Sequence, residues 1–183
     1  MRAGDHRRTD HRATPARGRR AGQAVIEFAF VLPVFLIVLV GLAELGIYLS
    51  HQISLIELSR EAAGVLSRGS SFDETFEAVL NADGDLDLSG SEGRIILTEI
   101  ELNQGGNPII TRQESRGGLG HSSAFGTLPP GHPSTTATIP NGMALTDGMT
   151  IMGVELFSRQ EPLGTAFSIS GLDPVILSSL SAF

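Results

Sequence analysis

The chain contains no cysteine and no lysine. Without cysteine it has no disulfides, no thiol chemistry and no thiolate metal site, so an exported domain must fold without covalent links. Aromatic residues are scarce as well, with nine phenylalanines, one tyrosine and no tryptophan in 183 residues. The sequence therefore predicts a modest core that is mainly aliphatic.

Positive charge is concentrated at the N-terminus. Residues 1–22 carry seven arginines and two aspartates, whereas residues 23–183 carry six arginines and 18 acidic residues. A basic leader before an apolar run keeps the N-terminus cytoplasmic and predicts export of the C-terminal part. The acidic remainder argues against nucleic acid as a partner, because phosphate binding needs clustered basic charge.

One long apolar run follows the basic leader. Phe28–Ala43 holds 16 residues without a charged, amide or hydroxyl side chain. With its apolar flanks it predicts a helix of about 24–26 residues, long enough to cross about 30 Å of hydrocarbon. Apolar residues then recur at helical spacing to Arg68, so the helix continues as an amphipathic stem that Gly69 ends. Glu27 and Glu44 flank the run, and an acid there needs an interface or a partner.

The start of this run resembles a known family. Gly22–Phe28 (GQAVIEF) matches the G/xxxxEF signature of prepilin-like proteins, in which a prepilin peptidase cuts after the glycine. The longer stretch GQAVIEFAFVLPVFLIVLVGLAELG resembles the TadE-like pseudopilins of the tight-adherence (type IVc) pilus system. Ser59–Gly64 is similar to that group's Ala-rich run after the membrane helix, and GVELFSRQEPLG near the C-terminus resembles its later strand and turn.

The resemblance implies particular site residues. Cleavage would fall between Gly22 and Gln23, and Glu27, followed by Phe28, would pair with the new α-amino group of a neighbouring subunit. Physical reasoning agrees, because a carboxylate in lipid gains most from an opposite charge supplied by another subunit. The alternative is a protonated Glu27 at the membrane interface.

The resemblance also implies partners and a location. The expected partners are the membrane, the prepilin peptidase, other pilin or pseudopilin subunits and the pilus assembly machinery, with no nucleic acid and no cofactor. We expect a protein of the bacterial inner membrane, with its N-terminus cytoplasmic and its head periplasmic or extracellular, or incorporated in the pilus.

Residues 69–183 predict a small α+β head with a short antiparallel sheet and one short helix. Ser71–Glu74 forms a capping box that opens a helix ending near Ala82. Residues 115–147 are rich in Gly, Pro, Ser and Thr and predict a flexible surface loop, while Val175–Phe183 is expected to pack on the head. Alternating apolar residues predict four strands: Arg94–Leu102, Pro108–Glu114, Gly148–Ser158 and Thr165–Ser170.

Two segments of the head resemble motifs that carry chemistry. Asp83, Asp85 and Asp87 have the spacing of a calcium loop, but the later positions lack the glycine and the glutamate that an EF-hand requires, which favours an acidic turn. Gly120–Ala124 (GHSSA) resembles the nucleophile elbow of hydrolases but has no strand before it. We expect no catalytic residues, no bound metal and no enzyme activity.

Three interpretations of the whole chain remain at this point. The first is a minor pilin with a cleaved leader (1–22), a membrane helix and stem (23–68) and an exported head (69–183). The second is an uncleaved, single-pass exported binding module. The third is a secretory signal peptide cut before Glu44, for which Gly41 and Ala43 supply small residues.

Overall fold

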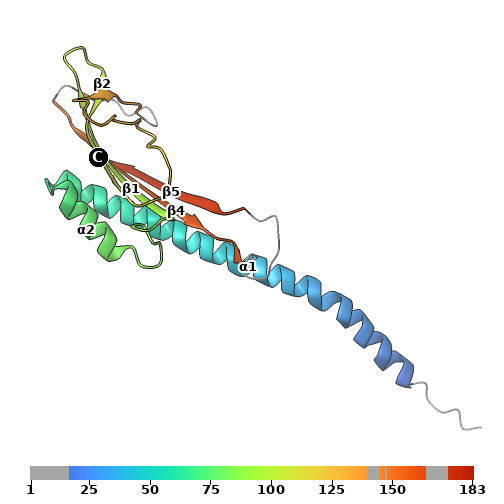
Figure 1. The fold of residues 1–183 in the computed structure, drawn as a ribbon. Coiled ribbons are helices and arrows are strands. Elements are labelled where there is room, and N and C mark those ends of the chain that lie inside the picture. Colours follow the sequence, from blue (N-terminus) through green and yellow to red (C-terminus); the bar gives the residue numbers. More distant parts are fainter. Residues whose placement is uncertain (1–16, 140–144, 147, 164–172) are drawn as a thin grey trace, which may run out of the picture. The chain divides into compact units, whose positions relative to one another are not determined.

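The computed structural model describes residues 17–139, 145–146, 148–163 and 173–183, with side chains from Gly22 onward (Figure 1). The chain divides into two compact units, Met1–Gly41 and Leu42–Phe183. Three expectations lie wholly or partly outside the described residues: the leader up to residue 16, the loop at 140–144 and 147, and the strand at Thr165–Ser170.

Helix α1 (Arg17–Ser67) begins earlier than the sequence suggested. We expected the membrane helix and stem to begin at residue 23, after the basic leader, whereas residues 17–22 are already helical. Arginine and alanine are good helix formers, and adding residues to an existing helix costs far less than starting one. Pro33 lies inside α1 without ending it. Gly69, with φ +92°, follows the last turn as expected for a glycine that ends a helix.

The capping box before α2 (Phe72–Ala82) is confirmed. The Ser71 hydroxyl accepts a hydrogen bond from the Glu74 backbone N–H at 3.2 Å, and the Glu74 carboxylate accepts one from the Ser71 N–H at 2.9 Å. The hydrogen bond from the Ser71 backbone lowers the pKa of Glu74. These reciprocal bonds satisfy two donors that a helix start otherwise leaves free. α2 buries one face, formed by Phe72, Thr75, Phe76 and Val79.

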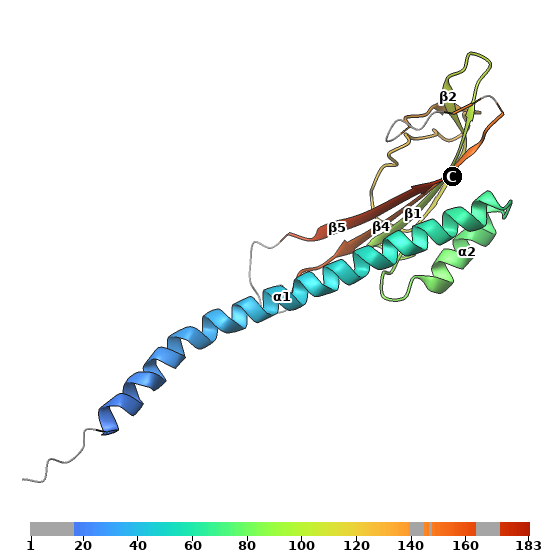
Figure 2. The ribbon, with the colours of Figure 1, turned by 180° about the vertical axis from the view of Figure 1, so that it is seen from behind.

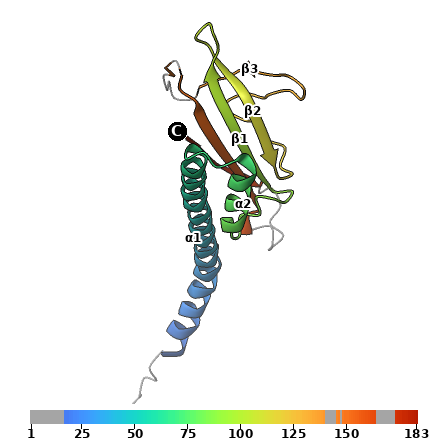
Figure 3. The ribbon, with the colours of Figure 1, turned by 90° about the vertical axis from the view of Figure 1, so that its left-hand side faces the viewer.

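The described strands form one antiparallel sheet in the order β3-β2-β1-β4-β5 (Figure 3). The predicted hairpin is present as β1 and β2, with an irregularity in register between Glu99 and Ile100. The small α+β head is therefore confirmed. The strands are β1 (Gly93–Leu102), β2 (Pro108–Arg116), β3 (Thr135–Thr136), β4 (Ile151–Gln160) and β5 (Val175–Ala182).

The C-terminal tail packs on the head as expected, but as a strand that the sequence analysis did not predict. Val175–Ala182 forms the edge strand β5, which pairs with β4 along eight residues. Its serines explain why the pattern was missed. The Ser59 hydroxyl lies 2.6 Å from that of Ser179 and 3.0 Å from that of Ser181, so these polar side chains point inward and bond to α1.

The main core lies between the helices and one face of the sheet. Within Leu42–Phe183, the last turns of α1 and the whole of α2 lie on the same side of the sheet (Figures 1 and 2). At 20–33 cal/mol per Å² of apolar surface, burial at this interface is the main source of stability in a chain without disulfides. The buried residues are Leu55, Leu58, Ala62, Ala63, Leu66, Phe72, Phe76, Val79, Leu86, Leu88, Ile95, Leu97, Val154 and Leu156.

The opposite face of the sheet is covered by the segment that we expected to be a flexible surface loop. Ser115 and Arg116 belong to β2, and Phe125 is fully buried beside Ile100 and Ile110. A side chain at Gly153 would come within 2.4 Å of the Phe125 ring, so this glycine makes room for it. The expectation of a flexible loop is wrong for the part around Phe125, because burial of this large aromatic side chain stabilises the packing of the segment on the sheet.

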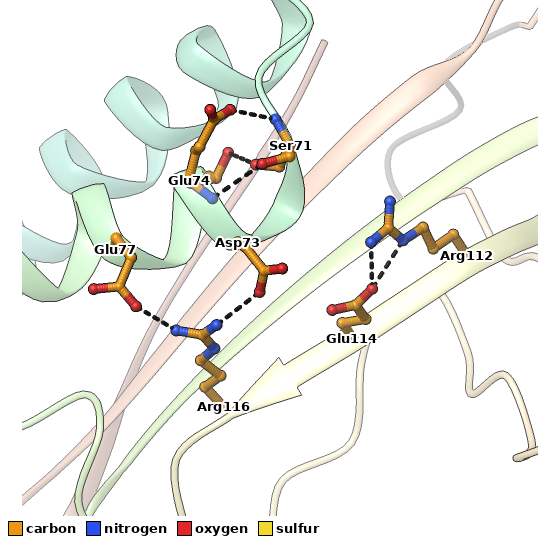
Figure 4. A network of polar contacts seen from close by, with 8 residues as sticks. Ser71, Asp73, Glu74, Glu77, Arg112, Glu114 and Arg116 are labelled. Carbon is orange, nitrogen blue, oxygen red and sulfur yellow. Dashed lines mark hydrogen bonds and ion pairs between the residues drawn. The ribbon is translucent and has the colours of Figure 1, made fainter.

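Two arginines on β2 contact α2, and Figure 4 shows the ion pairs of one of them, Arg116. The Arg116 guanidinium lies 2.8 Å from Asp73 and 2.8 Å from Glu77, and it stands 4.6 Å from the centre of the Phe76 ring. Arg112 lies 4.2 Å from the centre of the Phe72 ring. Cation–π contacts of this kind contribute about 0.5–1 kcal/mol each at exposed sites, so they support the packing of α2 rather than create it.

Removing a core aromatic should destabilise the head strongly. Phe76→Ala is expected to lower the free energy of unfolding by about 3–5 kcal/mol, because Phe76 is buried between α2 and the sheet. Denaturant titration of the full chain in detergent micelles measures this. Phe183→Ala is the matched control, since Phe183 is 61% exposed and should change stability by less than about 0.5 kcal/mol. Equal effects of the two variants would contradict the assigned core.

Candidate functional site

Among the described residues, one helix is long and apolar enough to cross a membrane. The span is Gly22–Ser67, its most apolar 18-residue window has a mean hydropathy of 2.8, and none of that window is buried within the protein. A segment of this length and composition near the N-terminus suggests a membrane anchor.

The apolar side chains of this helix are exposed between Val25 and Leu49. An apolar surface of this extent on an isolated chain marks contact with lipid or with other protein segments. The surface lies on residues that are 39–76% exposed: Val25, Ile26, Phe28, Phe30, Val31, Leu32, Val34, Phe35, Leu36, Ile37, Val38, Leu39, Leu42, Leu45, Ile47 and Leu49.

The expected cleavage site lies inside the helix. Gly22 and Gln23 both have helical backbone, and a Cβ added at Gly22 would meet nothing within 4 Å. The helix therefore does not itself require glycine at this position. A peptidase that cut here would first have to unwind the helix locally, which is least costly near a helix end.

Glu27 and Gln23 lie one turn apart on the same side of α1. The Gln23 side-chain amide donates a hydrogen bond of 2.9 Å to the Glu27 carboxylate, an i,i+4 contact between exposed side chains. Phe28, the next residue, is 62% exposed. The structure thus brings together the residue after the expected cut and the glutamate that the resemblance assigns to subunit assembly.

Glu44, at the other end of the apolar run, has a partner in its own helix. The Tyr48 hydroxyl donates a hydrogen bond of 2.9 Å to the Glu44 carboxylate. Each of the two glutamates that flank the run thus has one neutral donor within its own helix, the Gln23 amide for Glu27 and the Tyr48 hydroxyl for Glu44.

The three aspartates with calcium-loop spacing follow α2. The Asp83 carboxylate accepts a hydrogen bond from the Leu88 N–H at 3.3 Å, and Asp87 has φ +47° in the following turn. Within the described ranges, no group of three or more His, Cys, Asp or Glu side chains is placed to hold a metal ion. Asp83, Asp85 and Asp87 therefore do not form such a group. The described contacts of Asp83 shape a turn.

The hydrolase-like segment Gly120–Ala124 lies between β2 and β3, and no strand runs directly into it and no helix begins directly after it. The His121 ring nitrogen Nδ1 is 3.0 Å from the Ser122 backbone oxygen, and the ring stacks on Phe157 with centroids 4.2 Å apart. The strand–turn–helix geometry that a nucleophile elbow requires is not formed by these residues.

Sequence reasoning missed Glu155 of β4, which is 1% exposed. Its Oε1 accepts a hydrogen bond of 2.7 Å from the Ala124 N–H, while its Oε2 is buried without a hydrogen-bond partner in the described part of the chain. Burial raises the pKa of this carboxyl, and the nearby Ser123 hydroxyl, the Ala124 N–H and the charge of His121 oppose that rise. The sequence did contain a signal for this residue. Glu155 lies between Val154 and Leu156 in an apolar strand, and alternation along a strand places it on the opposite face of the sheet from these two residues.

A long apolar N-terminal helix followed by a small α+β head suggests a membrane-anchored protein. Residues 22–64 match the model of the family described as TadE-like protein. The match confirms the resemblance for this segment, less than a quarter of the chain, and suggests a pilin-like protein associated with the Tad pilus. A comparison with curated proteins finds no match, and a comparison with solved structures finds none either.

The raised pKa of Glu155 predicts a pH dependence of stability. Its folded-state pKa exceeds its unfolded value of about 4.3, so its contribution is complete below that pH and is lost as pH rises through the folded-state value. Glu155→Gln should not show this loss. Its stability relative to the unaltered chain should therefore increase from about pH 4 toward neutrality.

Denaturant midpoints measured across this pH range for both proteins test the prediction. Glu57→Gln, on an exposed position of α1, is the control with the same change in charge. Stability curves of the Glu155 variant and the unaltered chain that run parallel at all pH values would show that Glu155 is not desolvated in solution.

Proposed function

We propose that the chain is a minor pilin or pseudopilin of the tight-adherence (type IVc) pilus. A prepilin peptidase processes it after Gly22, and it takes part in pilus assembly through packing of its helix against other subunits. One observation carries the proposal: the segment that matches the TadE-like family also presents a continuous apolar surface that the chain itself does not bury.

The size of the head supports a minor or accessory role. The head that follows α1 contains a second helix and a sheet of five strands in its described residues. The resemblance implies a major subunit that is little more than the helix, so a chain with this additional domain fits a subunit present in few copies or an assembly factor. It acts by association and catalyses no reaction.

The proposed role of Glu27 follows from the chemistry of cleavage. Cutting after Gly22 leaves an α-amino group on Gln23, which is cationic below its pKa of about 7.7–8.0. In the uncut chain, Glu27 has the neutral Gln23 amide as its hydrogen-bond donor. A carboxylate in a low-dielectric environment is stabilised far more by a cation than by an amide, and a neighbouring subunit's new N-terminus supplies one.

The position of the bond supports a second candidate function. Gly22–Gln23 lies within α1, and a helical bond is a poor protease substrate until it unwinds. The second candidate is therefore an uncleaved, single-pass membrane protein whose exported head binds a partner.

The N-terminus of the mature protein separates these functions. Intact-mass measurement of the protein from cells with and without the prepilin peptidase should give a start at Gln23 that depends on the peptidase. Gly22→Leu should prevent cleavage without unfolding α1, because leucine is a good helix former and the position is open. An intact leader in cells that contain the peptidase would favour the uncleaved module, and a start at Glu44 would indicate a secreted head.

Replacing Glu27 should separate processing from assembly. We expect Glu27→Ala to be cleaved normally but to reduce surface pili about tenfold or more, since the new α-amino group loses its partner. Pili counted by electron microscopy, with cleavage followed by mass, provide the measurement. Glu44→Ala is the control, because it removes the same charge at the other end of the apolar run, far from the new N-terminus at Gln23. Normal piliation by the Glu27 variant would remove this residue from the mechanism.

A further inference from the structure

A cavity of about 270 Å³ lies on the side of the sheet opposite the helices. One wall is the segment His121–Ala124, and another is the edge strand β5. None of the cavity's lining residues is one that the proposed pilin function uses. It is lined by His121, Ser122, Ala124, Glu155, Phe157, Ser178, Ser179 and Leu180.

Glu155 gives this cavity a specific chemistry. The side chain is 1% exposed and lines the cavity, one of its oxygens is taken by the Ala124 N–H at 2.7 Å, and Oε2 has no partner among the described residues. A buried carboxylate oxygen without a donor costs free energy that a bound donor recovers. The position is thus prepared to accept one more hydrogen bond, preferably from a cation.

The other lining residues restrict what the bound group can be. They include no arginine, and the chain has no lysine, so His121 is the one titratable residue beside Glu155 in the lining of the cavity. Phe157, Leu180 and Ala124 are apolar and suit methylene groups, and the Ser178 hydroxyl is a further acceptor. The volume is below the range of about 300–1,000 Å³ typical of sites for drug-sized ligands, which favours a small or narrow group.

We propose that this cavity binds a primary ammonium group carried on a short aliphatic chain. The ammonium bonds to the Glu155 carboxylate once this side chain turns toward the cavity, and the methylenes lie between Phe157 and Leu180. Two sources share this chemistry, a free alkylamine and the lysine side chain of another protein. Because this chain has no lysine, a lysine that enters the cavity comes from a different protein and not from a second copy.

Binding of small amines to the full chain in detergent micelles tests the proposal. The probes are n-butylamine, Nα-acetyl-lysine-N-methylamide and the norleucine counterpart of the latter, which has the same chain without the ammonium. Calorimetric titration near neutral pH should show binding of the two amines and none of norleucine. Tighter binding of the lysine derivative than of butylamine indicates a protein partner, and the reverse order indicates a free amine.

Variants locate the binding. Glu155→Gln should weaken amine binding about tenfold or more, since a charge-assisted hydrogen bond is lost. Glu57→Gln, with the same charge change on α1, should leave binding unaltered. Ser178→Phe keeps the carboxylate but narrows the cavity at an exposed lining position, and it should also weaken binding. Norleucine binding as strong as lysine binding, unaltered affinity in Glu155→Gln, or no binding of either amine would overturn the proposal.

Discussion

The packing of the last turns of α1 against the sheet is the interaction on which the head depends. Leu55, Ala63 and Leu66 are at most 2% exposed and contact Ile95, Leu97, Val154 and Leu156 of the sheet within one core cluster. A chain with no disulfide and few aromatics has no other source of comparable stability. α2 extends the same core through its phenylalanines, and β5 is bound to α1 through Ser59. Both elements thus depend on the position of the stem.

The two ends of α1 differ in what they can pack against, because the helix changes along its length from apolar on all sides to amphipathic. An amphipathic stretch can be covered on one face by a sheet while its other face stays in water. A stretch that is apolar all round needs a surrounding that is apolar on every side, which this chain does not provide. The match to the TadE-like family covers this stretch and most of the stem, and the sheet of the head lies beyond it. The family match therefore bears on the helix, and any binding by the head has to be explained by its own residues.

Local patterns predicted those elements whose causes are local. The capping box at Ser71 and Glu74, the stop at Gly69 and the β1–β2 hairpin depend on residues a few positions apart, and the structure has all three. β5 was missed as a strand because its inward positions include serines, which are satisfied by Ser59 some 120 residues earlier. The loop was interpreted as flexible because its composition is that of a linker, while a single buried Phe125 holds it against Gly153. Residues far apart in sequence decided both cases.

The sequence by itself determined the long apolar helix, the amphipathic stem, the basic leader and the resemblance at Gly22–Phe28. Each of these follows from composition and helical period along one continuous segment. Tertiary structure alone decided which face of β4 is covered by helices and which by the loop. That choice placed Glu155 beneath His121–Ala124, where the Ala124 N–H satisfies one oxygen and leaves the other free. A sequence shows that an acid is present in a strand, but desolvation depends on what the rest of the chain lays over it.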